Sequence, residues 1–115
     1  MGEKRANHVD ADQVFGALAD QRFRDVLRCL DERETPIELA ELADAVASRT
    51  HDEPVAALPD RTVERTYIAL YHAHVPRLAA SGLVSYNQCQ ELVDTTEPFE
   101  PIVKSVLEET SSKLE

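Results

Sequence analysis

The stretch HAHVPRLAASGLVSY, residues 72–86, predicts where a helix ends and a strand begins. Pro76 lies inside the helical pattern, and its ring removes one backbone donor and clashes with the preceding turn, which predicts a kink there. Gly82 suits the left-handed residue that often ends a helix. The apolar run LVSY then starts a strand, and ELVDT, residues 91–95, is its expected partner across the turn NQCQ. These residues predict a small β-hairpin after a long helix.

Four helices are predicted before this hairpin, because apolar residues recur there at helical spacing. A first helix begins at Asp10, and a second follows Asp20 as its N-cap. A third, of about ten residues, covers ELAELADAVAS. The longest one occupies residues 61–82, capped by Asp60 or Thr62, after a loop over residues 49–60. Their apolar positions are, in order, Val14, Phe15 and Leu18; Phe23, Val26, Leu27 and Leu30; Leu39, Leu42, Ala43 and Val46; and Val63, Tyr67, Leu70, His74 and Leu78.

A last helix follows Pro98, with Phe99, Ile102, Val103 and Val106 on one face. The fold class is therefore mainly α with a small β-hairpin, arranged as a winged helix-turn-helix with an additional C-terminal helix. We expect residues 1–8 to be a flexible tail, residues 9–97 to form the winged helix-turn-helix domain, and residues 98–115 to form the C-terminal amphipathic helix.

The chain is strongly acidic, with 22 Asp and Glu against 12 Lys and Arg and a net charge of −10. Nine of the basic residues are arginine and three are lysine. This balance is typical of a halophilic protein, because molar salt screens the self-repulsion of an acidic surface. An acidic protein from a mesophile is the alternative interpretation.

The location of the protein is predicted from what the sequence lacks. No apolar run approaches the about 18 residues of a membrane span, and the first residues hold no apolar core of a signal peptide. Cys29 and Cys89 are too few for a disulfide framework, and we expect them to be reduced thiols. A cytoplasmic protein is therefore expected.

Three motifs in residues 15–86 resemble one family: ALAD-x-R-x-R-x-VL, ELA-x-x-VA and IAL-x-H-x-H-x-P-x-LA-x-x-GLV. Together they resemble a haloarchaeal family of small winged-helix proteins of unknown function, similar in pattern to ArsR-type transcriptional regulators. The resemblance implies a DNA-binding regulator. It does not extend to metal sensing, because no metal-binding cysteine pair follows the early helices. The loop over residues 49–60 is also longer than the tight turn usual in that pattern.

The resemblance places a recognition helix, residues 62–80, in the major groove of double-stranded DNA. Wound at about 100° per residue, its residues opposite Leu70 and Val63 are polar or small. Arg65 is suited to reading guanine, while arginines elsewhere on this helix and on the second helix are suited to phosphates. The predicted DNA-contacting residues are Arg61, Arg65, Thr66, Ala69, His72 and Arg77.

The expected wing, residues 83–97, holds no Lys or Arg but contains Glu91, Asp94 and Glu97. A wing that follows DNA phosphates normally supplies a cation. The acidic wing therefore favours the alternative function, a protein-interaction or dimerisation module without direct DNA contact.

The apolar stripe of the last helix must be buried either on its own domain or against a second copy. We expect a homodimer formed through the first and last helices, with Phe99, Ile102, Val103 and Val106 as dimer contacts.

Other chemical signals are weak. His72 and His74 lie two residues apart on nearly opposite helix faces, so they cannot share a metal ion. His74 and Cys29 are expected in the core, and Cys89 in the hairpin turn. Three glycines leave no phosphate-binding loop, and no nucleophile and base stand at a useful spacing. We therefore expect no enzyme activity, cofactor, metal or small-molecule ligand.

Overall fold

The computed structural model describes the backbone of residues 21–114 and the side chains of residues 21–105 and Leu107. The predicted tail, the helix from Asp10, the Asp20 cap and the side chain of Val106 lie outside the described residues. Within them, the chain is mainly helical and carries a three-stranded antiparallel sheet. The elements are α2 (Gln21–Glu32), β1 (Ile37–Glu38), α3 (Leu39–His51), η1 (Val55–Ala57), α4 (Asp60–Ala69), η2 (Leu70–His74), α5 (Val75–Ala80), β2 (Val84–Asn87), β3 (Leu92–Thr95) and α6 (Phe99–Leu114).

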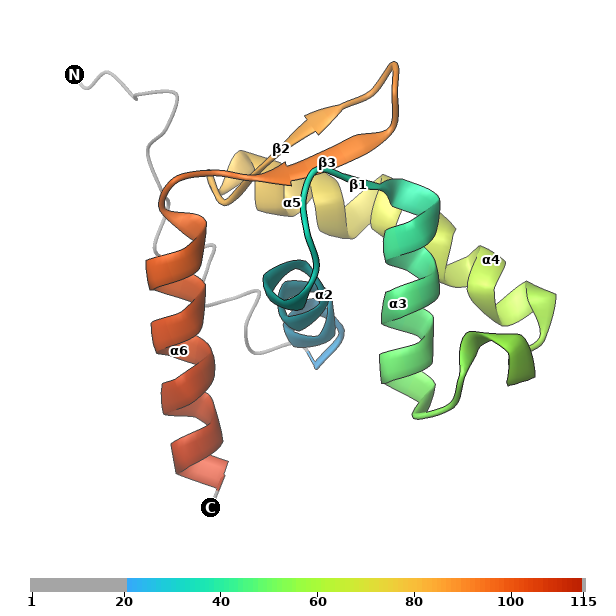
Figure 1. The fold of residues 1–115 in the computed structure, drawn as a ribbon, viewed down its shortest axis with the longest axis horizontal. Coiled ribbons are helices and arrows are strands. Elements are labelled where there is room, and N and C mark those ends of the chain that lie inside the picture. Colours follow the sequence, from blue (N-terminus) through green and yellow to red (C-terminus); the bar gives the residue numbers. More distant parts are fainter. Residues whose placement is uncertain (1–20, 115) are drawn as a thin grey trace.

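The helices are arranged around α2, which contacts both α3 and α6. Figure 1 shows α6 and α3 on opposite sides of α2, while the sheet and the continuous run from α4 to α5 cross one end of the molecule. α4 packs on α3 and then extends to the right of the view. One face of α4 therefore stands clear of the rest of the domain.

The predicted hairpin is confirmed as β2 and β3, with Tyr86 opposite Val93. The sheet also has a strand that the sequence analysis did not predict, because Ile37 of β1 pairs with Val93 from the other side. The strand order is β1-β3-β2. β1 has two residues, which is too short to show the alternation by which a strand is recognised. The hairpin is thus joined to the segment between α2 and α3.

The predicted helix end at Gly82 is confirmed. Gly82 has a φ of 90°, its N–H donates to Ala79 O, and the N–H of Leu83 donates to Leu78 O. This pair of bonds is the Schellman arrangement, in which a left-handed residue closes the last turn. Leu78 and Leu83 are both buried, so the helix end is also fixed by apolar contact.

The helix widens immediately before Pro76. The sequence predicts a kink at this proline, and the structure has a π-helical turn, η2, in which the N–H of Val75 donates to Leu70 O. A proline cannot donate to the carbonyl four residues earlier, and a π-turn accommodates one extra residue. The face of the helix beyond Ala69 is therefore rotated relative to a regular helix.

Two predicted boundaries are wrong. α3 continues to His51 instead of ending after about ten residues, because no helix-breaking residue occurs before Asp52, which adopts a φ of 54°. The connection to α4 is shorter than predicted for the same reason. Neither Asp60 nor Thr62 caps α4, since its N-cap is Pro59 and no side chain bonds there.

The last helix packs on its own domain. Phe99 and Val103 are 3% and 0% exposed and belong to the same core as Phe23 and Leu27 of α2, and Leu107 joins them. Ile102 is half-buried against that core. Phe99 and Val103, which the sequence analysis expects at a dimer interface, are thus buried within one chain, and the homodimer itself stays a prediction. Cys29 is buried, as predicted.

Asp25 links α2 to α3 inside the fold. It is 5% exposed, and its carboxylate accepts hydrogen bonds from Thr50 Oγ1 at 3.0 Å and Gln21 Nε2 at 3.2 Å. We expect Asp25→Ala to lower the free energy of unfolding by about 1–3 kcal/mol, because the Thr50 hydroxyl loses its charged partner. Urea melts would measure this, with Asp31→Ala, exposed on the same helix, as control. Equal losses in both variants would contradict a role for the buried carboxylate.

Candidate functional site

The candidate site is the exposed side of α4, and we call it the outer face of α4. We use this name for Arg61, Glu64, Arg65 and Ile68, which are all exposed. Arg61, Arg65 and Ile68 are spaced four and three residues apart, which puts them in one row on a helix. Ile68 is 48% exposed, so this row has two guanidinium groups and one apolar side chain.

Both arginines of the outer face are available for an external anion. Neither Arg61 nor Arg65 forms a salt bridge with a carboxylate of residues 21–105, where the ion pair found joins Arg49 of α3 to Glu32 of α2. Two exposed carboxylates, Asp60 and Glu64, lie on the same helix. The charges of α4 are therefore balanced, whereas the chain as a whole carries a net charge of −10.

The structure separates the predicted DNA-contacting residues into three places. Arg61 and Arg65 lie on the outer face. Thr66 and Ala69 are half-buried and turn toward α2 and α3, so Ala69 does not share a face with Arg61 as the regular winding predicts. The Thr66 hydroxyl donates to Thr62 O at 3.0 Å, which keeps it within the helix.

His72 and Arg77 lie beyond the π-turn. Both are exposed. The His72 ring packs edge-on against Tyr71, with 4.9 Å between centroids. The Arg77 guanidinium lies 4.9 Å from the centroid of the Phe23 ring, in a cation–π contact. Arg77 therefore presents its charge beside the start of α2 instead of along the outer face of α4.

The turn of the hairpin is hydrogen-bonded to α3, α4 and η2. Tyr67 donates its hydroxyl to the Glu91 carboxylate, Gln88 Nε2 donates to Tyr71 Oη at 3.2 Å, and Leu39 N–H donates to the Glu91 carbonyl. Both tyrosines are half-buried against the core. The acidic side chain of the turn is thus held by a tyrosine next to the outer face.

Glu91 raises the pKa of Tyr67 to about 12, chiefly through this hydrogen bond. Because the folded-state pKa lies above the ordinary value of 10, the bond stabilises the fold fully below pH 10 and is lost as the pH rises toward 12. We expect Glu91→Gln to shift the titration of Tyr67 back toward 10, as measured by ultraviolet absorbance of the phenolate. Glu97→Gln is the matched control, and an unchanged titration in Glu91→Gln would contradict the contact.

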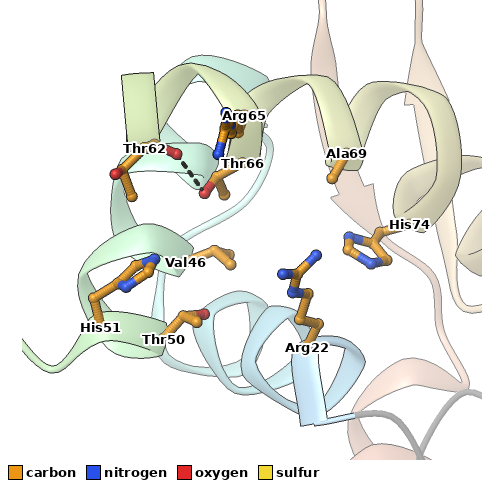
Figure 2. A pocket seen from close by; sticks show the side chains of 9 residues that line it. All are labelled: Arg22, Val46, Thr50, His51, Thr62, Arg65, Thr66, Ala69 and His74. Carbon is orange, nitrogen blue, oxygen red and sulfur yellow. Dashed lines mark hydrogen bonds between the residues drawn. The ribbon is translucent and has the colours of Figure 1, made fainter. Parts of the chain in front are cut away.

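A cleft of about 180 Å³ opens beside the outer face, between α2, α3 and the α4–η2 run. Four basic side chains line it: Arg22 of α2, His51 of α3, Arg65 of α4 and His74 of η2. Figure 2 shows Arg22 reaching toward the middle of the cleft, with His74 on one side and His51 on the other. Arg65 therefore takes part both in the outer face and in this cleft.

The cleft is also lined by small side chains that are apolar or carry a hydroxyl. Val46 and Ala69 supply apolar surface, and Thr50, Thr62 and Thr66 supply hydroxyls. His74 is buried, as predicted, and its ring packs edge-on against Phe23 with 4.8 Å between centroids. The cleft is thus a shaped surface built from helices that are far apart in sequence.

Sequence reasoning missed Ile68, His51 and the place of Arg22 among the site residues. Ile68 follows Arg61 by seven residues and Arg65 by three, so the helical spacing alone contains that signal. His51 lies in a segment predicted as a loop, and its approach to Arg22 depends on how α3 packs on α2. No local pattern contains that information.

Two further searches are negative for the part of the chain that is described. Among those residues, no group of three or more His, Cys, Asp or Glu side chains is placed to hold a metal ion. No helix there combines the length and apolar character needed to cross a bilayer. Cys89 lies exposed in the hairpin turn, as predicted.

A comparison with protein-family models finds one match over residues 15–94, described as a domain of unknown function, DUF7344. The matched residues extend from before α2 to Asp94 within β3 and stop before α6. No curated protein and no solved structure matches the chain.

Proposed function

The chain belongs to the DUF7344 family of domains of unknown function, and we propose that it is a winged helix-turn-helix regulator that binds double-stranded DNA through the outer face of α4. In this proposal α3 and α4 form the helix-turn-helix, α2 packs behind them, and β2 and β3 form the wing. The observation that carries the proposal is the pair of exposed arginines on α4, Arg61 and Arg65, which form no salt bridge with the carboxylates of residues 21–105.

The groups on the outer face suit a major groove. An arginine can donate two parallel hydrogen bonds to guanine, and an apolar side chain can contact the methyl group of thymine. Arg65 and Ile68 supply these groups, while Arg61, at the start of α4, suits a phosphate. Thr66 and Ala69, which face the cleft, are left out of the proposed contacts.

The acidic hairpin limits the footprint on DNA. Its turn presents Glu91 and no cation, and Glu91 is engaged by Tyr67. We therefore place the phosphate contacts on the helices, with Arg77 beside the start of α2 as a second contact along the backbone. The wing supports α4 in this arrangement and does not follow the DNA strand.

Binding to duplex DNA across a series of KCl concentrations tests the proposal. We expect the logarithm of the association constant to fall linearly with the logarithm of salt, with a slope of about −0.9 for each phosphate neutralised. Fluorescence anisotropy on a pool of random duplexes, followed by sequencing of the bound fraction, gives both the slope and the preferred sequence. No binding at any salt concentration would contradict the proposal.

A second candidate function is self-association without DNA contact, and Ile68 favours it. At 48% exposed, Ile68 is a large apolar side chain on the outer face, and the buried centre of a protein interface is more apolar than its rim. Sedimentation velocity separates the two candidates. Self-association through this face predicts a dimer that Ile68→Glu converts to the 12.8 kDa monomer, whereas the DNA-binding proposal predicts no change in mass.

We also propose that the protein works in concentrated salt, as in halophilic archaea, because of its net charge of −10 and its three lysines. Raising KCl from about 0.1 M to about 2 M shortens the Debye length from about 10 Å to a few Å and screens the self-repulsion. We expect the melting temperature to rise by roughly 5–15 °C over this range, which corresponds to about 1–2 kcal/mol. Circular dichroism would measure it, and a melting temperature that is flat or falls with salt would contradict the proposal.

A further inference from the structure

We propose that the cleft between α2, α3 and the α4–η2 run is a binding site for a phosphate group. The proposal goes beyond DNA binding by the outer face and stands without it. It is carried by the convergence of Arg22, His51, Arg65 and His74, which come from four different elements. Guanidinium groups match the geometry of phosphate oxygens through paired N–H donors, and imidazoles add single N–H donors.

The charge of the cleft opposes the charge of the chain. Acidic residues outnumber basic ones 22 to 12, yet among the described residues that line the cleft there is no carboxylate. The buried Asp25 carboxylate accepts a hydrogen bond from the hydroxyl of Thr50, which lines the cleft. An acidic chain that gathers four basic side chains around one hollow creates a local attraction for an anion.

The size of the cleft fits a phosphate group better than a whole nucleotide. Its volume of about 180 Å³ lies below the roughly 300–1,000 Å³ of pockets that enclose drug-sized ligands. Val46 and Ala69 close part of the wall with apolar surface, which lowers the local dielectric and strengthens the charged hydrogen bonds. A phosphate group would therefore enter alone or as the end of a larger molecule that stays outside.

Two sources of this group fit the position of the cleft. Arg65 belongs to both the cleft and the outer face, so a phosphate of bound DNA can approach from that side. A free phosphorylated metabolite can enter the same cleft and meet the same four side chains. The chemistry of recognition is the same, and the experiment distinguishes the source.

The first arm uses inorganic phosphate and the full chain without DNA, in KCl adjusted to constant ionic strength. We expect the side-chain NMR signals of His51 and His74 to shift saturably. Arg22→Gln and, as a second variant on the exposed end of α3, His51→Asn should each weaken binding about tenfold, since each changes a side chain that can donate to a phosphate oxygen. Arg24→Gln, on the same helix as Arg22 but outside the cleft, is the control.

The second arm measures whether phosphate displaces duplex DNA. Competition identifies the cleft as a contact for the DNA backbone, and binding without competition identifies it as a site for a free phosphorylated ligand. The proposal is overturned if the histidine signals shift without saturation, or if both cleft variants bind phosphate as tightly as the Arg24→Gln control. Because the first arm contains no DNA, failure of the cleft and failure of DNA binding are observed separately.

Discussion

Phe99→Ala is expected to lower the free energy of unfolding by about 3–5 kcal/mol, the usual range for removing a buried phenylalanine. Phe99 is 3% exposed and shares its core with Phe23 and Leu27 of α2. The loss arises within one chain, so the melting temperature should not depend on protein concentration. Urea denaturation measures the free energy of unfolding, and thermal melts at two protein concentrations about tenfold apart measure the concentration dependence of the melting temperature.

Glu100→Ala is the control for this prediction, because Glu100 is the exposed neighbour on the same turn of α6. A small loss of stability in Phe99→Ala, or a melting temperature that rises with concentration, would show that α6 is covered by a second copy. That outcome would restore the dimer interface that the sequence analysis predicts for Phe99 and Val103.

The double variant Arg61→Ala/Arg65→Ala is expected to lose most of the affinity for DNA. A bidentate contact of Arg65 with guanine contributes about 1–3 kcal/mol, and loss of the phosphate contact of Arg61 reduces the salt slope by about 1. The two residues lie one helical turn apart and form no salt bridge within the described residues, so their removal leaves no buried charge behind. Folding should therefore be preserved, as checked by circular dichroism.

Arg33→Ala is the control for charge. It removes one positive charge, half the change in the double variant, from the end of α2, where Arg33 lies beside Phe99. The DNA-binding proposal predicts normal affinity in this control. Equal losses of affinity in Arg33→Ala and in the double variant would indicate attraction by overall charge instead of contact by the outer face.

Features with local signals could be predicted from the sequence. Gly82 ends its helix because it alone there tolerates a positive φ, and the apolar runs on both sides of residues 88–91 pair as β2 and β3. The helical stripes of α2 and α3 likewise identify the core positions that the structure buries. Each of these inferences depends on neighbours within a few residues.

Features that depend on packing could not be predicted. The apolar stripe on α6 predicts that Phe99 and Val103 are buried. It does not indicate whether they pack against α2 or against another chain. Pro76 signals an irregular helix, but the π-turn over Leu70–His74, which rotates His72 and Arg77 relative to α4, is one of several ways to accommodate it. Arg22 of α2 and His51 of α3 line the same cleft because the two helices pack together. Their spacing in the sequence does not indicate this.

The most direct test of DNA binding through the outer face is genome-wide immunoprecipitation of the tagged chain from cells grown at native salt, beside the Arg61→Ala/Arg65→Ala variant. We predict discrete enriched sites for the wild-type chain and for Arg33→Ala, and loss of those sites in the double variant at equal protein level. An absence of enriched sites, or the same sites in the double variant, would contradict the account.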